Sequence, residues 1–260
     1  MKLPIYQIDA FTSRIFEGNP AAVIPLEEWI TSKLMQKIAM ENNLSETAFI
    51  VKAGPDYEIR WFTPLCEVDL CGHATLAAAH LVLYLLEPDK NEVIFSSKSG
   101  NLNVKKEDGL LAINLPSAQN KEADVPENLT EALGKKPLEV YESDDLMAVY
   151  ETESDIQNLN PDFIKLKGID TRGIVVTAPG EHVDFVSRFF APAVGINEDP
   201  VTGSAHTKLV PFWSARTGKK ELNAKQLSKR TGKLICRNNN EYVQLLGNAR
   251  IYLTGEITTK

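Results

Sequence analysis

This chain of 260 residues contains few cysteines, no long apolar run and no excess of positive charge. Its 3 cysteines, an odd number, argue against a disulfide framework and favour a reducing compartment, the cytoplasm. The longest apolar run near the end of the alanine- and leucine-rich stretch at 72–86, residues 81–86, is far shorter than the roughly 20 residues of a membrane-spanning helix. The net charge of −7 argues against a nucleic-acid-binding surface. We therefore expect a cytoplasmic protein that binds neither membranes nor nucleic acids.

Sequence motifs of several common classes of site are also missing. Neither a glycine-rich nucleotide-binding loop nor a nucleophile elbow occurs. Cys66, Cys71 and His73 lie close together in sequence, but without a second ligand cluster they are a weak signal for zinc. Residues 1–6 are typical of a strand and not of a signal peptide. These absences argue against a nucleotide site and against a metal centre.

One stretch dominates what is present. Gly72, His73 and Ala74 open an alanine- and leucine-rich run that continues to Leu86 and stops before Glu87 and Pro88. Alanine and leucine are strong helix formers, and a run that is apolar on nearly every face predicts a buried helix. The first N–H groups of such a helix and the positive end of its dipole form a natural anion-binding site.

The same arrangement occurs twice. The first copy has Arg-Trp-Phe-Thr-Pro at 60–64 and a helix start at Gly72, and the second has Arg-Phe-Phe-Ala-Pro at 188–192 and a helix start at Gly203. A repeat at about half the chain length predicts two similar domains. Two helix N-termini would then define one cleft between the domains, unless the copies are a coincidence between two ordinary strand–turn–helix units.

Short apolar segments between turn residues predict many strands around the two buried helices. The expected helices lie at about 31–42, 72–86, 127–133 and 161–166 and from 203 onward, where Pro211 should kink the last one. Residues 116–126, rich in polar residues and bounded by prolines, are the best linker candidate. The predicted class is α+β with mixed sheets, in two domains at 1–115 and 116–250.

Glu46 is the main candidate for acid–base chemistry. Apolar neighbours surround it in sequence, with Leu44 before it and Ala48, Phe49 and Ile50 after it. Burial raises the pKa of a carboxyl group above its usual value of about 4.3, because the charged form loses its hydration. Such a group can take and give a proton near neutral pH. The alternative is a glutamate that only caps a segment or lies on the surface.

His73 lies at the start of the first central helix, and Asp199 lies just before the second. A histidine at a helix start stays neutral, since the dipole opposes its charging, and it can then donate from one nitrogen and accept at the other. It can equally be a simple cap. Asp199 stands four residues before Gly203, on a loop long enough to fold over a cleft, although a carboxylate there can also be a dipole partner. The matching carboxylate in the first copy is Asp69, for which capping is the better interpretation.

Cys71 could act as a thiolate base if the helix end lowers its pKa. A two-base racemase needs a second base on the opposite face of the substrate, and the equivalent position holds Thr202, a poor base. Of the remaining histidines, we expect His80 in the core and His206 as a packing residue.

Five motifs, in order through both halves, together resemble the PhzF-like isomerase family of phenazine biosynthesis. They are Asp-Ala-Phe-Thr through Glu-Gly-Asn-Pro-Ala-Ala-Val at 9–23, Leu-Ser-Glu-Thr-Ala-Phe at 44–49, Arg-Trp-Phe-Thr-Pro at 60–64, Leu-Cys-Gly-His-Ala-Thr-Leu at 70–76, and Glu-Asp-Pro-Val-Thr-Gly-Ser-Ala-His at 198–206. A sixth, at 226–232, has Thr231 where such proteins often carry glycine.

The resemblance implies the fold of diaminopimelate epimerase and proline racemase. In that fold two pseudo-twofold-related domains each wrap a curved mixed sheet around a central buried helix, and the active site lies in the cleft between them. The resemblance further implies a homodimer, and a C-terminal strand at about 250–260 that returns to the first domain.

The family resemblance also implies roles for particular residues. A glutamate in the Ser-Glu-Thr motif, here Glu46, shuttles a proton on a dihydro-hydroxyanthranilate ring without a metal or an organic cofactor. His73, Asp199 and Ser204 would assist it, and Gly72 and Gly203 would hold the substrate carboxylate. Asn19 lies in the first motif and would face the cleft. We thus expect Glu46, His73 and Asp199 to be catalytic, and Asn19, Gly72, Gly203 and Ser204 to bind the substrate.

Three functions are compatible with these features. The first is a cofactor-independent isomerase that moves a proton on a small carboxylate-bearing substrate, either a phenazine precursor or a related cyclic or unsaturated amino or hydroxy acid. The second is an epimerase or racemase that uses Glu46 or Cys71. The third is a catalytically silent dimer that binds a small carboxylate.

Overall fold

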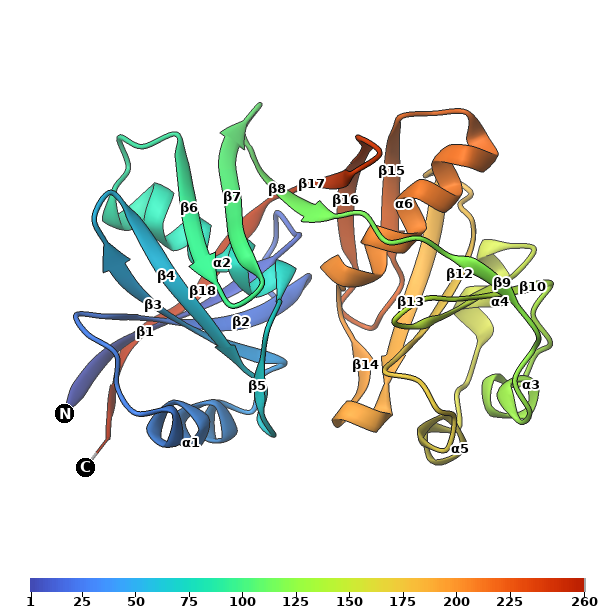
Figure 1. The fold of residues 1–260 in the computed structure, drawn as a ribbon, viewed down its shortest axis with the longest axis horizontal. Helices are drawn as coiled ribbons and strands as arrows, with labels where there is room; N and C mark the ends of the chain where they lie inside the picture. Colours follow the sequence, from blue (N-terminus) through green and yellow to red (C-terminus); the bar gives the residue numbers. More distant parts are fainter. Residues whose placement is uncertain (260) are drawn as a thin grey trace. The chain divides into compact units, whose positions relative to one another are not determined.

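The structure, a computed structural model, describes residues 1–259 (Figure 1). The chain forms two compact units, of which the first contains residues 1–115 and the segment from Leu245 onward, and the second contains residues 116–244. We call them the first unit and the second unit. Within the described part of the chain, every helix is too short or too polar to cross a membrane.

The first unit contains most of the regular structure of the N-terminal half. Its strands are β1 (Lys2–Ala10), β2 (Asn19–Leu26), β3 (Glu46–Ala53), β4 (Asp56–Phe62), β5 (Glu67–Val68), β6 (Glu92–Ser97), β7 (Gly100–Glu107), β8 (Leu110–Pro116) and the C-terminal β18 (Ala249–Thr258). Its helices are α1 (Ser32–Asn42), α2 (Gly72–Leu81) and the π-helical turn η1 (Val82–Leu86).

The sheet of the first unit runs in the order β18, β1, β2, β3, β4, β6, β7 and β8. The pairs β2–β3 and β4–β6 are parallel and the others are antiparallel, so the sheet is mixed as predicted. Figure 1 shows the red β18 running beside the blue β1, its antiparallel partner. The short β5 folds back onto the end of β4, with Trp61 opposite Val68.

Helix α2 is the buried centre of the first unit. All of its residues except His80 are buried, and it packs against β1, β2, β3, β7 and β18. This agrees with its composition, because a helix that is apolar on every face is stable only inside a core. The predicted helix does reach Leu86, but its last turn is π-helical, and the Glu87 amide donates to the Val82 carbonyl oxygen at 2.7 Å.

The second unit contains the remaining elements. Its strands are β9 (Lys121–Ala123), β10 (Glu139–Glu142), β11 (Leu146–Val149), β12 (Ile174–Pro179), β13 (Phe185–Ala191), β14 (Ile196–Asp199), β15 (Glu221–Gln226) and β16 (Gly232–Asn238). Strand β17 (Tyr242–Gly247) crosses the boundary between the units. The helices are α3 (Leu129–Leu133), α4 (Glu153–Asn158), α5 (Phe163–Lys167), the 3₁₀ turn η2 (Pro192–Val194) and α6 (Gly203–Thr217).

The second unit repeats the strand pattern of the first. Its sheet order is β9, β10, β11, β12, β13, β15 and β16, with parallel pairs β11–β12 and β13–β15. In both units a strand, a short return strand and a buried helix are followed by a parallel partner of that strand. The sequence repeat therefore reflects a repeated topology, and the predicted α+β class with mixed sheets is confirmed.

The same ion pair holds the return strand in each copy. Arg60 donates to both carboxylate oxygens of Glu67 at 2.8 Å, and Arg188 donates to both of Glu198 at 2.7 and 3.1 Å. Two parallel hydrogen bonds fix the geometry of such a pair as well as its distance. Each therefore orients the loop that leads into the central helix of its unit.

Three local expectations need correction. Residues 116–126 are not an irregular linker, since β9 lies within them and pairs with β10. Helix α4 was not expected, although Thr152 and Asp155 form a capping box that signals its start. Asp199 pairs with Phe189, and the corresponding place opposite Trp61 is held by Val68, so Asp69 is not its structural counterpart.

Candidate active site

Glu46 and His73 meet inside the first unit. Glu46 is the first residue of β3, three residues after Asn43, whose left-handed backbone (φ 49°) ends α1. His73 is the second residue of α2. Their side chains are 12% and 4% exposed, and Glu46 Oε2 lies 3.2 Å from His73 Nε2. Glu46 and His73, which belong to two different motifs and lie 27 residues apart in sequence, thus form one cluster.

Asn19 determines which nitrogen of His73 carries the hydrogen. Its amide Nδ2 lies 3.2 Å from His73 Nδ1, and an amide nitrogen can only donate. With this orientation of the amide, Nδ1 accepts and the ring hydrogen is on Nε2, the atom that faces Glu46. The first residue of β2 therefore orients the imidazole toward the carboxyl group of Glu46.

Burial keeps His73 uncharged. Loss of hydration lowers the pKa of the imidazole from its usual value to about 3. At neutral pH the contact with Glu46 is therefore not an ion pair, because a neutral N–H faces a carboxyl group. The neutral imidazole therefore does not neutralise Glu46, which is left as the group that can exchange a proton.

Cys71 completes this cluster. Its sulfur lies 3.6 Å from His73 Nδ1, and it is buried, whereas Cys66 is exposed. Glu46, Cys71 and His73 each offer an atom that could bind a metal, and these atoms lie within 4.8 Å of one another. The sequence spacing suggested Cys66 as the partner of Cys71 and His73, but the structure brings Glu46 there instead.

Of the four remaining predicted site residues, Gly72 is the first residue of α2, next to His73, and the other three lie together at the start of α6 in the second unit. Asp199 is buried, and its Oδ2 accepts a 2.5 Å hydrogen bond from the Thr202 hydroxyl group. Gly203 and Ser204 are the first two residues of α6, and Gly203 is buried. Thr202, the residue before the helix, uses its hydroxyl on Asp199 and makes no side-chain cap.

Gln226 holds this loop in place, a role that the sequence did not reveal. Its Oε1 accepts from the Thr202 amide at 2.8 Å, and its Nε2 donates to the Asp199 carbonyl oxygen at 2.7 Å. Gln226 opens the sixth motif, so the position of that motif was the only available signal. The loop that carries Asp199 is thereby fixed to the end of β15.

A buried ion cluster lies next to Ser204 and was also missed. Asp145 accepts from Arg172 Nε at 2.8 Å and Nη2 at 2.6 Å, and from Lys208 Nζ at 2.7 Å. Burial raises the pKa of Asp145, but the bonds from Arg172 and Lys208 outweigh it and hold that pKa below its usual range. A lysine in an otherwise buried helix needs a partner, and Lys208 was therefore a readable signal.

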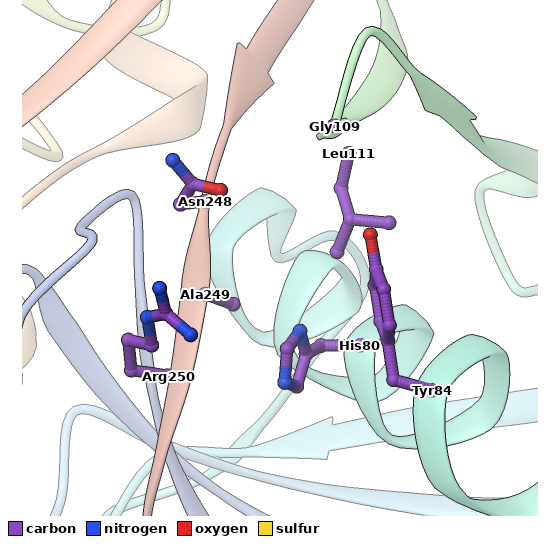
Figure 2. A pocket seen from close by; sticks show the side chains of 7 residues that line it. All are labelled: His80, Tyr84, Gly109, Leu111, Asn248, Ala249 and Arg250. Atoms are coloured by element: carbon purple, nitrogen blue, oxygen red, sulfur yellow. The ribbon is translucent and has the colours of Figure 1, made fainter.

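The other histidines differ in their surroundings. His206 is buried as expected, and its Nδ1 lies 2.8 Å from the Thr202 carbonyl oxygen. His80 was expected in the core, but it lines a cavity of about 300 Å³ with Tyr84 and Arg250. Figure 2 shows these side chains at the far end of α2. His80 is about 10 Å along the helix from His73, so this cavity is separate from the Glu46 cluster.

The buried histidines should make the protein sensitive to acid. Burial lowers the pKa of His73 to about 3 and that of His206 to about 4, whereas both titrate near about 6.5 when unfolded. Below about pH 6.5 the unfolded chain takes up protons that the folded chain does not, so stability falls with pH. Each histidine should contribute up to about 1.4 kcal/mol per pH unit to this slope.

Urea unfolding of the wild type and of His206→Gln, at several pH values between about 7 and 5, measures this slope. The variant should show the smaller dependence on pH, whatever its absolute stability. His182→Gln, at an exposed position, is the matched control and should keep the wild-type slope. Equal slopes for wild type and His206→Gln would contradict the assignment of a neutral buried His206.

Comparison with known proteins gives consistent results for sequence and structure. The family model described as phenazine biosynthesis-like protein matches residues 8–256. A protein of Pseudomonas aeruginosa named as an uncharacterized isomerase is 48% identical over 99% of each chain. The crystal structure of a PhzF-family phenazine biosynthesis protein from Enterococcus faecalis is 43% identical, covers 100% of both chains and has a TM-score of 0.96. A hydroxyproline epimerase from Agrobacterium vitis has the same fold at 9% identity, with 98% and 92% covered and a TM-score of 0.65.

Proposed function

The chain belongs to the phenazine biosynthesis-like (PhzF) protein family, as its five motifs predicted, and from this premise we propose that it is a cofactor-independent isomerase that moves a proton on a small carboxylate-bearing substrate. Relatives at 48%, 47% and 45% identity carry the name isomerase, which supports the class of reaction. The substrate within that class is a cyclic or unsaturated amino or hydroxy acid, with phenazine precursors among the candidates.

One observation carries the proposal. A largely buried carboxyl group, that of Glu46, lies 3.2 Å from an imidazole that burial keeps neutral. In the proposed reaction Glu46 takes a proton from a substrate carbon, and the electron pair of the broken C–H bond moves into the conjugated carboxylate. Glu46 then returns the proton to a different carbon, so the double bond moves and nothing is oxidised or reduced. His73 assists by directing its neutral Nε2–H group toward the Glu46 carboxyl group, and it keeps that hydrogen throughout.

We assign the remaining predicted residues by their chemistry. Asp199 is the second carboxyl group of the proposal, and its hydrogen bond from Thr202 supports a fixed orientation. Gly203 and Ser204, like Gly72, offer backbone N–H groups at a helix start, which suit a carboxylate. Asn19 has the additional role of orienting His73. The proposal also includes a homodimer, which light scattering of the purified protein would test.

Solvent isotope exchange tests the reaction. Candidate small carboxylates are incubated with the protein in deuterated water, and incorporation of deuterium at carbon is followed by NMR. An isomerase of this kind exchanges a carbon-bound hydrogen and moves a double bond. A protein that binds carboxylates without catalysis would show thermal stabilisation by a ligand but no exchange, and this outcome would remove the proposal.

An epimerase remains the second candidate, because Cys71 lies 3.6 Å from His73 in the same cluster. Inversion of a stereocentre without movement of a double bond would favour it. The two reactions are separated by analysing the exchanged product on a chiral column.

Cys71→Ser and Cys66→Ser are expected to keep activity close to that of the wild type. The position equivalent to Cys71, before Gly203, holds Thr202, so a two-thiol mechanism has no second thiol. The exchange rate of each variant measures this, and metal analysis of the same samples should find no stoichiometric zinc or iron. Inactivation by Cys71→Ser alone, with the fold intact by circular dichroism, would restore the thiol-base hypothesis.

A further inference from the structure

The ion cluster beside α6 has two positive charges and one negative charge. Asp145 pairs with both Arg172 and Lys208, and the described residues provide no second carboxylate for either cation. Both cations also touch Ser204, Arg172 Nη2 at its Oγ and Lys208 Nζ at its carbonyl oxygen, each at 3.4 Å. The positive end of the α6 dipole adds to this excess. Asp145 can balance only one of the two positive charges, so the cluster keeps a net positive charge that attracts an anion.

Only Arg172 can present this charge to a ligand. The side chain of Lys208 is 1% exposed, whereas that of Arg172 is 45% exposed. A guanidinium group has five N–H donors, and Arg172 directs Nε and Nη2 toward Asp145 and Ser204. Within residues 1–259 the structure records no protein partner for Nη1, so the hydrogens of that nitrogen remain for an anion.

Arg172 also influences the direction in which Ser204 can donate. The Ser204 hydroxyl oxygen lies on the Nη2 side of the guanidinium group and accepts from it. A hydroxyl that accepts at its oxygen still has its own hydrogen to donate elsewhere. The Ser204 hydroxyl group and Arg172 Nη1 each keep a hydrogen to donate, and two such donors suit the two oxygens of one carboxylate.

The neighbours of Arg172 restrict its movement. A Cβ atom on the next residue, Gly173, would lie 2.3 Å from Phe189 Cζ and 3.1 Å from Asp145 Oδ1. Only a glycine allows the chain to approach both groups so closely. The guanidinium carbon is 5.9 Å from the Phe189 ring, and two bonds to Asp145 fix its plane. A donor group held in place in this way loses little entropy when it binds a ligand.

We propose that Arg172 selects for an anionic substrate by binding its carboxylate together with the Ser204 hydroxyl group. In this arrangement Lys208 does not touch the ligand. It keeps Asp145 from neutralising Arg172, so that one positive charge is left over for the substrate. The inference rests on the proposed function in one respect, namely that Gly203 and Ser204 bind the substrate carboxylate.

Binding of benzoate and of benzamide, its neutral counterpart, tests the role of Arg172. Isothermal titration at constant ionic strength should show that the wild-type protein binds benzoate and discriminates against benzamide. Arg172→Gln should weaken benzoate binding by about 10- to 100-fold, as expected for lost hydrogen bonds to a charged group. Arg172→Lys should recover part of this loss, because an ammonium group keeps the charge but cannot bond Asp145 in two places.

Two further variants make the test specific. Arg216→Gln, at the other end of α6, removes an arginine that is 38% exposed and paired with Glu139, and it should bind benzoate like the wild type. Lys208→Met removes the excess positive charge at a residue that does not contact the ligand. It should weaken benzoate binding several-fold, because Asp145 then neutralises Arg172. It also gives an independent reading if Arg172→Gln fails to fold.

The possible results are decisive. Wild-type affinity in Arg172→Gln, equal binding of benzamide, or no binding of benzoate by the wild type would each overturn the role of Arg172. Glu46→Gln separates this inference from the proposed reaction, since it should keep benzoate binding while losing isotope exchange. If Arg172 controls benzoate binding but the wild type exchanges no carboxylate, the anion site stands and the proposed reaction fails.

Discussion

Glu46→Gln is expected to fold normally and to lose activity by several orders of magnitude. The amide keeps the shape of the side chain and its position beside His73, but it cannot take up a proton from carbon. General acid–base catalysis alone contributes about 10²–10⁴ in rate. The rate of deuterium incorporation into the substrate identified by screening, compared between variant and wild type, measures the loss.

Glu41→Gln is the matched control for this experiment. Glu41 is exposed on α1, near the start of β3. Its substitution removes the same negative charge at a position outside the Glu46 cluster. It should retain wild-type exchange. Activity of Glu46→Gln within about tenfold of the wild type would show that Glu46 does not carry the proton.

Asp145→Asn is expected to give the largest loss of stability, about 3–5 kcal/mol. The substitution leaves Lys208 buried and next to Arg172 with no negative charge between them. Loss of one partner of a buried ion pair is costly, because the remaining charge has neither water nor a counter-ion. The free energy of unfolding in urea, with the wild type measured in parallel, gives the magnitude.

Two comparisons make this result interpretable. Asp144→Asn, at the neighbouring exposed position, should change the free energy of unfolding by less than about 0.5 kcal/mol. Because the pKa of Asp145 lies below its usual range, its contribution is present above about pH 3.9 and is lost as the pH falls through the folded-state value. The difference between Asp145→Asn and wild type should therefore shrink in strong acid, and a constant difference would contradict the charge-based explanation.

The parts of the fold that depend on local sequence could be predicted. The composition of residues 72–86 was sufficient for a buried helix, and α1, which Thr31 caps, lies within the helix predicted at about 31–42. The repeat at Gly72 and Gly203 predicted two copies of one topology. Helix α4 was missed because its core contact is a single buried residue, Ile156, which gives no periodic signal.

The candidate site could be predicted only in part. Family motifs gave Glu46, His73 and Asn19, but the contacts among them depend on how β2, β3 and α2 pack, which no local pattern encodes. Asp145 and Arg172 stand before β11 and β12, and the parallel pairing of those strands brings them together. When strand pairing brings together residues that are far apart in sequence, the residues next to them give no signal of the contact.

The pairing of β18 with β1 has a consequence for the order in which the chain can fold during synthesis. Strand β1 is synthesised before the second unit, yet its partner, residues 249–258, is made only after the whole of that unit. The second unit, at 116–244, is continuous in sequence and can complete its sheet while β1 still has an open edge. An unpaired edge is the part of a sheet most prone to associate with another chain. The interval in which the first unit waits for β18 is therefore the time at which the nascent protein is most exposed to misassembly.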